Sequence, residues 1–443
     1  MDNAISLALV FLGLMVFLAH LFAAFYRRRK VPDVLMLIII GLVIGPILGL
    51  AGPQDLGAFG PVFTTITLVV ILFVGGTNLS VATLEASWKS STTLTLSAFI
   101  VSVAVLGAIA YTLLGFSLNN AIMIGAILGG TSSAMVIPMV QQMKNLGEES
   151  KTALALESAL TDVLSIMVVL ACIQVFQEGE INVGMTIGSV FSAFTFAAVM
   201  GVGGALLWSR FIRYIRKIKD SIFTTPAFVF VIYGVAELLG FNGAIAALAF
   251  GITMANIETF KSFIFQKIMG GQGNKFSDAE LVFFNELSFL LKTFFFVYIG
   301  MSIVFENVKA LIVGLIFTAV IYIVRLFVAK FAAPKAANLY DKTIISMMTP
   351  KGLAAAVLAT MPEMAVRAKF SMEELLTNEV AQKALADAVM IKNITYAVVL
   401  FSVILTSALI IASDKSKKLS GFYSTFFGEK PKNFQNEDEV TQT

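Results

Sequence analysis

Charged residues, cysteine and histidine are all scarce in this chain, and each scarcity excludes a class of protein or site. Lys, Arg, Asp and Glu make up 13% of the 443 residues, whereas they make up about 25% of a typical soluble domain. Cys172 is the only cysteine, so the chain offers neither a disulfide framework nor a multi-cysteine metal site. The only histidine, His20, lies inside an apolar segment and is expected to be a packed or interfacial polar residue rather than a pH sensor.

Apolar residues are abundant instead, at 58% of the chain with a mean hydropathy of +0.88. This composition predicts an all-α polytopic membrane protein, because a spanning helix needs about 20 predominantly apolar residues. Residues 1–414 are expected to form the transmembrane domain. The template of a spanning helix matches about thirteen segments: 4–26, 34–51, 62–80, 92–115, 119–143, 152–176, 183–209, 221–239, 241–258, 281–304, 308–333, 343–362 and 385–412.

The basic residues around these segments follow the positive-inside rule. The run Arg27–Lys30 directly follows the first segment, which indicates a retained helix rather than a cleaved signal peptide. Later basic clusters fall in alternate loops, whereas the loops 52–61, 117–119 and 177–182 contain no lysine or arginine. The chain is therefore expected to cross the cell membrane many times, with its N-terminus outside and its C-terminus in the cytoplasm. Its small net charge of +3 does not suggest nucleic-acid binding.

Three stretches outside the apolar segments carry further predictions. Residues 256–280 are amphipathic and are expected to lie on the inner membrane interface. Residues 363–384 resemble a short surface helix on the outer side. Residues 415–443 are polar with few large apolar side chains, so they are expected to form a flexible cytoplasmic tail.

Glu157, Ser158, Thr161 and Asp162 lie near the middle of an apolar stretch and are the strongest sign of function in the sequence. A carboxylate in the hydrocarbon core costs about 2.5–3.5 kcal/mol on insertion scales, so it normally faces a protein interior or a water-filled cavity. Ser158 and Asp162 are four residues apart and share one face of a helix. Their oxygens predict a small site for a hard cation.

Two apolar segments contain residues that interrupt a helix. The run Gly129–Ser133 is rich in glycine and hydroxyl residues, and Pro138 follows it. The run Met348–Gly352 combines a proline with a glycine. Paired broken helices in the two halves of a membrane protein are typical of inverted-repeat secondary transporters, in which the irregular backbone lines a cavity. For the first run, small residues that allow close helix packing are the alternative interpretation.

The ordered set of these motifs resembles the cation:proton antiporter superfamily, the sodium/proton and potassium/proton exchangers of bacteria and archaea. The resemblance covers about residues 5–412 and is carried by the stretches 129–134, 157–162, 294–301 and 349–354. It implies a dimerisation domain and a six-helix core domain, in which two unwound helices cross near the ion site. It also implies a homodimer.

The resemblance assigns roles to individual residues. Asp162 would exchange a proton for the cation, Ser158 would be a further ligand, and Thr131 would contribute an oxygen from the unwound strand near 129–134. Glu157 would order the site by pairing with a basic residue of a later helix. Arg325 is the expected partner, and the alternative is that Arg325 snorkels toward the inner surface.

Two positions depart from the pattern of many sodium-selective relatives. Ser132, itself a candidate ligand, stands where these relatives carry an acidic residue, and Thr161 stands where they carry Asn or a second Asp. With one exchangeable carboxylate, the resemblance implies electroneutral exchange of one cation for one proton. We therefore expect an antiporter that exchanges Na⁺ (or Li⁺) for H⁺, with a K⁺/H⁺ antiporter of the same fold as the alternative.

A single buried carboxylate can serve such an exchange without a cofactor. Apolar surroundings favour its protonated form, and a nearby cation favours its ionised form, so Asp162 can hold either one. Asp162, Ser158 and Thr131 supply carboxylate, hydroxyl and carbonyl oxygens, which small hard ions prefer. The expected partners are monovalent cations, protons and membrane lipids, and no catalytic residue is expected.

Two lysines within apolar segments are further candidates. Lys292 could interact with the site aspartate, as a lysine does in some relatives, and Lys351 could compensate helix-end carbonyls at the second break near 348–353. Two other classes of protein fit less well. The sequence contains no repeated segment that resembles an ion-selectivity filter, as a channel would require. Glu157 and Asp162 point about 140° apart on a helix, so they are poorly placed to share a proton as the two carboxylates of an aspartyl protease do.

Overall fold

The fold was analysed in a computed structural model of the chain. The residues that it describes are 10, 13, 14, 16–18, 20, 21, 33–50, 52, 59–79, 81–178, 183–218, 221–260, 275–302, 307–413 and 417–428. The first apolar segment, 4–26, and the amphipathic stretch 256–280 therefore lie largely outside the described residues, and the predictions for them stay predictions.

Every regular element in the described part of the chain is a helix. The first helices are α2 (Asp33–Leu42), η1 (Val43–Ile47), α3 (Phe59–Thr77), α4 (Val81–Leu114), α5 (Leu118–Gly129), α6 (Ser133–Gln142), α7 (Glu148–Glu178) and α8 (Val183–Ile215). They are followed by η3 (Ser221–Phe223), α9 (Thr224–Leu238), α10 (Gly243–Ala255), α11 (Ile257–Phe260), α13 (Asp278–Met301) and α14 (Val308–Ala332). The last helices are α15 (Leu339–Met347), α16 (Leu353–Leu358), α17 (Met361–Lys369), α18 (Met372–Thr377), α19 (Glu379–Ser413) and α20 (Lys417–Phe427).

These helices occupy each predicted apolar segment from 34–51 onward. Among the described residues, six helices are long and apolar enough to cross a membrane: Lys89–Leu114, Glu148–Gln177, Ser192–Ile212, Asp278–Met301, Val308–Ala332 and Glu379–Ser413. The tight turn between the segments 221–239 and 241–258 is present. Gly240 adopts a left-handed φ of 77° there, and the Asn242 side chain caps α10 by accepting a hydrogen bond from the Ile245 N–H.

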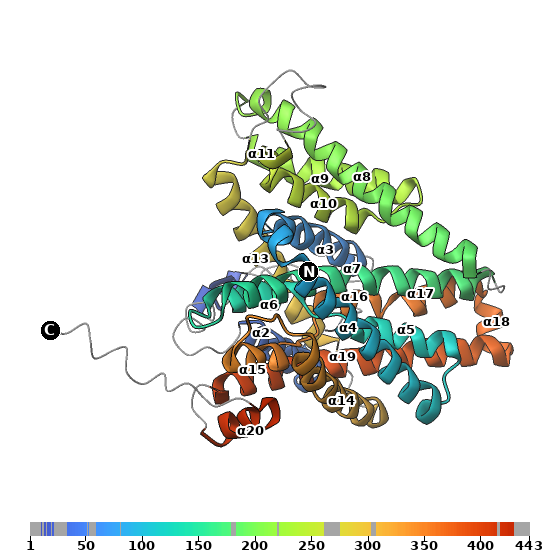
Figure 1. Ribbon diagram of the computed structural model, residues 1–443. Coiled ribbons are helices and arrows are strands. Elements are labelled where there is room, and N and C mark those ends of the chain that lie inside the picture. Colours follow the sequence, from blue (N-terminus) through green and yellow to red (C-terminus); the bar gives the residue numbers. More distant parts are fainter. Residues whose placement is uncertain are drawn as a thin grey trace.

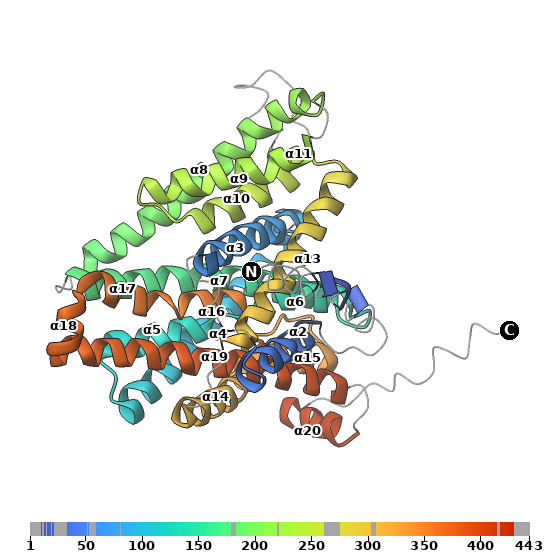
Figure 2. The same cartoon turned by 180° about the vertical axis from the view of Figure 1, so that it is seen from behind.

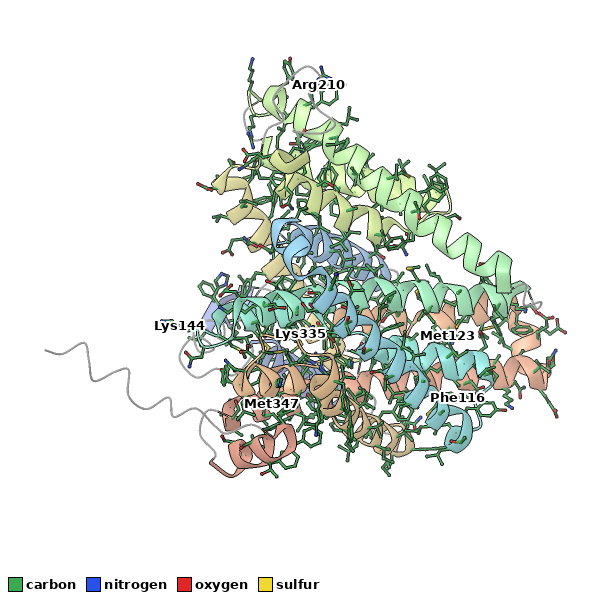
Figure 3. The ribbon with its side chains drawn as sticks, viewed as in Figure 1. Phe116, Met123, Lys144, Arg210, Lys335 and Met347 are labelled. Carbon is green, nitrogen blue, oxygen red and sulfur yellow. The ribbon has the colours of Figure 1, made fainter. Side chains whose placement is uncertain are left out.

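Helix α7 runs through the middle of the bundle (Figures 1 and 2). On one side lie α3, α8, α9 and α10, which pack against one another, and on the other side lie α4, α5, α14 and α19. Figure 3 shows Phe116, just before α5, near one end of the bundle and Lys144, just after α6, near the other. The two short helices α5 and α6 together therefore cover the distance that α7 covers as one helix.

Glycines allow two pairs of helices to pack with their backbones in contact. A Cβ on Gly76 of α3 would lie 2.5 Å from the Leu248 carbonyl oxygen of α10, and one on Gly251 would lie 2.2 Å from the Phe73 carbonyl oxygen. Gly41 of α2 and Gly300 of α13 form the same kind of contact, with each Cβ position 2.8 Å from the other glycine's Cα. Small residues at such crossings give the close van der Waals contact that holds helices together in lipid.

The prediction of a flexible tail is wrong for residues 417–427, which form the helix α20. Its Tyr423 side chain is buried, and Phe426 packs edge-on against Phe327 of α14. The Lys330 ammonium donates a hydrogen bond to the Phe426 carbonyl oxygen, 2.9 Å away. The low average hydropathy of 415–443 concealed this helix, because its aromatic side chains are concentrated in one short stretch. The rest of the predicted tail, 429–443, lies outside the described residues.

The stretch 363–384, predicted as one surface helix, contains two short helices and the start of α19. Serine caps α18, since Ser371 and Glu374 form a reciprocal capping box. Glu363 of α17 accepts hydrogen bonds from Arg367 and from Lys392 of α19, which ties this surface stretch to a long helix. Burial raises the pKa of the Glu363 carboxyl, but the hydrogen bonds from Lys392 and Arg367 outweigh it and hold the pKa below its usual value.

We expect Gly76→Ala to destabilise the protein by about 1–3 kcal/mol, because the new methyl group would overlap the backbone of α10. Gly75→Ala is the matched control, since a Cβ at Gly75 would meet no atom within 4 Å. Thermal unfolding in detergent should give a lower melting temperature for Gly76→Ala and an unchanged or higher one for Gly75→Ala. Equal melting temperatures would show that the α3–α10 contact is not tight.

We expect Glu363→Gln to lower stability at neutral pH by about 1 kcal/mol or less, since the ion pairs are partly exposed. A carboxylate with a depressed pKa stabilises the fold above its unfolded-state pKa and stops doing so as the pH falls through its folded-state pKa. The difference in melting temperature between wild type and variant should therefore shrink as the pH falls below 4.5, the ordinary glutamate value. A difference that is independent of pH would contradict this assignment, and Glu373→Gln on α18 serves as the exposed control.

Candidate functional site

The polar cluster predicted from the sequence lies in the middle of α7 and is buried. Glu157, Ser158, Thr161 and Asp162 are all at most 5% exposed. They lie within two turns of the centre of the 31-residue helix Glu148–Glu178, far from either end. A carboxylate at this position is surrounded by protein rather than by lipid, as expected for a functional group within a membrane protein.

Both predicted helix interruptions are present, and they touch each other beside α7. Helix α5 ends at Gly129 and α6 begins at Ser133, while α15 ends at Met347 and α16 begins at Leu353. The Ser132 N–H of the first break donates to the Pro350 carbonyl of the second, at 2.9 Å. Glycine is required at this contact, because a Cβ on Gly352 would lie 2.2 Å from the Ser132 hydroxyl oxygen.

Sequence and local physics account for where these helices stop. Glycine has low helix propensity, and the adjacent Gly129 and Gly130 weaken the end of α5. Pro350 has no N–H to give to a helix and disfavours the helical conformation in the residue before it. The backbone groups left unpaired must find partners in the protein interior.

Asp162 is held by a hydroxyl group from the first break. The Ser133 hydroxyl donates a hydrogen bond to Asp162 Oδ2, at 2.7 Å. Sequence reasoning missed Ser133, although it belongs to the hydroxyl-rich run Gly129–Ser133 that marks the break. The only signal in the sequence was its place at the end of that hydroxyl-rich run, since the start of α6 at Ser133 is evident only in the structure.

The other predicted ligands are engaged in bonds that fasten the first break to α7. The Thr131 N–H donates to the Thr161 hydroxyl at 3.1 Å, and the two threonine hydroxyls lie 3.3 Å apart. The Ser158 hydroxyl donates to the Ala155 carbonyl of its own helix, at 2.8 Å. The Thr161, Ser158 and Thr131 hydroxyls thus all have protein partners in this arrangement, and the roles predicted for them stay predictions.

Glu157 and Arg325 form the buried ion pair predicted from the sequence. Arg325, on α14, donates to both carboxylate oxygens of Glu157, and the Nη2–Oε2 distance is 2.6 Å. Its Nε donates to the Ile345 carbonyl of α15 at 2.8 Å. Both side chains are at most 3% exposed. The pair therefore links α7 to α14 and to the helix that leads into the second break.

Lys351 contributes a second positive charge where the two breaks meet. Its ammonium donates to the Gly130 carbonyl at 2.7 Å, and its backbone N–H donates to the Ser402 hydroxyl at 2.9 Å. The prediction that Lys351 compensates carbonyls of the second break is thus corrected in one respect, because the carbonyl that it binds belongs to the first break. The reason is the crossing itself, which brings residue 351 opposite the end of α5.

A cavity of about 10 Å³ lies next to this group of charges. Its polar lining comprises Ser102, Thr131, Glu157, Arg325, Thr349 and Lys351. This volume is about the minimum that can hold one water molecule. The polar groups therefore form two neighbouring parts: Asp162 with its hydrogen-bond partner Ser133, and the Glu157–Arg325 pair, which lines the cavity.

Lys292 lies on α13 and is partly buried, with its ammonium 5.8 Å from the centre of the Phe289 ring. A role for Lys292 at the site stays a prediction. The Asp162, Ser133, Thr131 and Lys351 groups are brought together by α5, α6, α7 and the second break, whereas Lys292 comes from a different helix, α13.

We expect Glu157→Gln and Arg325→Gln each to destabilise the protein by about 3–5 kcal/mol, because either change leaves a buried charge without its partner. The double variant should recover part of this loss, so its destabilisation should be smaller than the sum of the two. Melting temperatures of the four proteins in detergent form the double-mutant cycle. Strictly additive losses would contradict a direct interaction between the two side chains.

Comparison with known proteins identifies the family. The profile described as "Sodium/hydrogen exchanger, transmembrane" matches residues 14–412. The chain is 24% identical over 285 residues to the protein named Na(+)/H(+)-K(+) antiporter GerN of Bacillus cereus, covering 63% of this chain and 68% of that protein. It is 22% identical over 241 residues to the K(+)/H(+) antiporter NhaP2 of Shewanella sp. (strain ANA-3), covering 52% of this chain but only 41% of that protein.

A solved structure has the same fold. It is described as the sodium proton antiporter MjNhaP1 from Methanocaldococcus jannaschii at pH 8, and it superposes with a TM-score of 0.71 at 21% identity. The superposition covers 94% of this chain and 99% of that one. The profile match extends over most of the chain, including both breaks, all of α7 and the Arg325 helix. The chain therefore belongs to the sodium/hydrogen exchanger family of transmembrane transporters.

Proposed function

We propose that this protein is a secondary antiporter that exchanges Na⁺ (or Li⁺) for H⁺ by alternating access. The observation that carries this proposal is the position of Asp162, a buried carboxylate at the point where two interrupted helices cross. Its hydrogen-bond partner there is the neutral Ser133 hydroxyl. Family membership supports a transporter rather than an enzyme, and relatives named as Na⁺/H⁺ antiporters support the choice of ions.

Ser133 suits an aspartate that changes its protonation state. A hydroxyl group can donate to a carboxylate and can rotate to accept from a protonated carboxyl. Both forms of Asp162 thus keep a hydrogen bond, which limits the penalty for burying either one. Proton and cation compete for the same carboxylate, so each inward passage of one requires an outward passage of the other.

The stoichiometry follows from which charges are free to change. Glu157 is held in the bidentate pair with Arg325, so neither its carboxylate nor the guanidinium takes part in exchange. Asp162 is then the single exchangeable carboxylate, and one cation is exchanged for one proton. The transport cycle is electroneutral.

The arrangement of helices supports the division into moving and static parts. Helices α4–α7 and α14–α16, with α19, contain the site and both breaks, and correspond to the proposed core domain. Helices α3 and α8–α10, packed on the other side of α7, correspond to the proposed dimerisation domain of a homodimer. The distribution of basic loops supports an external N-terminus and a cytoplasmic C-terminus, with the cell membrane as the location.

K⁺/H⁺ exchange is the alternative function, and one specific observation favours it. Ser132 stands where many sodium-selective relatives carry an acidic residue, and a site with fewer carboxylates attracts a small, strongly hydrated ion less well. Relatives named as K⁺/H⁺ antiporters also match part of the chain. Transport rates for a series of Li⁺, Na⁺ and K⁺ in proteoliposomes separate the two functions.

We expect Asp162→Asn to abolish exchange, because an amide can neither hold the exchanged proton nor neutralise a cation. The measurement is cation-induced proton efflux from proteoliposomes that contain the purified protein. Asp387→Asn is the matched control: Asp387 is a carboxylate of α19 that accepts a hydrogen bond from Asn120, at 3.2 Å, outside the site. Efflux at the wild-type rate in Asp162→Asn would disprove the mechanism.

A further inference from the structure

Two buried hydroxyl groups next to the breaks have no hydrogen-bond partner among the residues that the structure describes. Ser132, at the first break, and Ser165, on α7, are at most 4% exposed. The hydroxyl oxygens of both lack a partner, unlike those of Ser133, Ser158 and Thr161. A buried polar group without a partner is destabilising, so native proteins keep few of them, and each one requires an explanation such as a bound ion or water.

Ser165 lies against the same unwound strand as Asp162. It follows Asp162 by three residues on α7, so the two side chains project toward neighbouring positions on one side of the helix. Its hydroxyl oxygen lies 2.7 Å from the position that a Cβ on Gly130 would occupy. Thus α7 presents the Asp162 carboxylate to Ser133, where α6 begins, and the Ser165 hydroxyl to Gly130, just after the end of α5.

The two unpartnered hydroxyls occupy the space that a side chain would fill at one glycine in each break. The Ser165 hydroxyl oxygen lies 2.7 Å from a Cβ position on Gly130 of the first break, and the Ser132 hydroxyl oxygen lies 2.2 Å from one on Gly352 of the second. Between these two positions, the Ser132 backbone N–H donates a hydrogen bond to the Pro350 carbonyl. The free oxygens therefore lie on either side of the crossing rather than at a distant packing defect.

The chemistry of the free oxygens suits the transported ion. A hydroxyl oxygen has two lone pairs for a hard monovalent cation. Of the predicted ligands, Ser158 and Thr131 have hydroxyls with protein partners, whereas the Ser132 hydroxyl has none among the described residues. The Ser165 hydroxyl, which the sequence analysis did not predict as a ligand, has none there either. A cation at Asp162 would give these two hydroxyls the partner that they lack.

We propose that Ser165 contributes its hydroxyl oxygen to the coordination of the transported cation, together with Asp162 and Ser132. This inference rests on the proposed function, and it adds a ligand that the motif around Asp162 did not indicate. Ser165 determines part of the cation affinity and, because oxygen is a hard ligand, part of the selectivity among monovalent cations.

The test uses Ser165→Ala, which removes the oxygen, and Ser165→Cys, which keeps the size of the side chain but replaces a hard ligand with a soft one. Ser91→Ala is the matched control, since Ser91 on α4 is also buried with an unpartnered hydroxyl. For each purified protein, the half-saturating concentration and maximal rate of exchange are measured for Na⁺, K⁺ and the softer ion Tl⁺. The rise in melting temperature that each cation produces is measured in detergent.

We expect Ser165→Ala to raise the half-saturating cation concentration about tenfold, as the loss of an interaction with a charged group does, with a smaller change in maximal rate. Ser165→Cys should lose affinity for Na⁺ and K⁺ but shift in favour of Tl⁺. Both variants should show a reduced melting-temperature rise with Na⁺ and K⁺, whereas Ser91→Ala should resemble wild type in every measurement.

Wild-type affinities in Ser165→Ala, or full recovery of Na⁺ and K⁺ affinity in Ser165→Cys, would overturn the proposal, because the side chain would then only fill space. Failure of the proposed function has a different signature. In that case Asp162→Asn would still exchange ions, whatever the behaviour of the Ser165 variants.

Discussion

The structure depends on compensating the polar backbone that two interrupted helices leave in the middle of a membrane protein. Each helix end exposes N–H or C=O groups that lipid cannot satisfy. Two of the bonds cross from one break to the other, since Ser132 donates to Pro350 and Lys351 donates to the Gly130 carbonyl. A third joins the first break to α7, where Thr131 donates to Thr161. Glycine at position 352 lets the two strands approach closely enough for these bonds. Without this mutual compensation, neither break could persist beside α7, and no oxygen-lined site could form there.

The need to satisfy buried polar groups also separates the buried charged side chains into two kinds: those held in fixed interactions and one that can exchange its proton. Glu157 and Arg325 neutralise each other, and the guanidinium also satisfies a carbonyl of α15. Lys351 is committed to a carbonyl at the end of α5. Asp162 differs from these groups, because its side chain is bonded to the hydroxyl of Ser133, which accommodates either protonation state. In the proposed antiporter, fixed charges build the site and one carboxylate carries the exchange.

Much of this arrangement could be predicted from the sequence, and the limits have physical causes. Apolar length located the helices, and Gly129 and Pro350 located the breaks. The pairing of Glu157 with Arg325 was expected from the family resemblance. The role of Ser133 depends on how α6 leaves the break, which no periodicity encodes. The partner of Lys351 depends on the crossing of two segments more than 200 residues apart, as the separation of 221 between Lys351 and Gly130 illustrates. Helix α20 was missed because its aromatic residues are few and lie within a polar stretch.

The central claim is that a proton and a cation cannot occupy Asp162 together. The most direct measurement is proton release by purified protein in weakly buffered detergent solution when Na⁺ or K⁺ is added near neutral pH. We expect close to one proton to appear for each cation bound, and we expect a higher proton concentration to weaken cation binding in proportion. Saturable cation binding without proton release would contradict it.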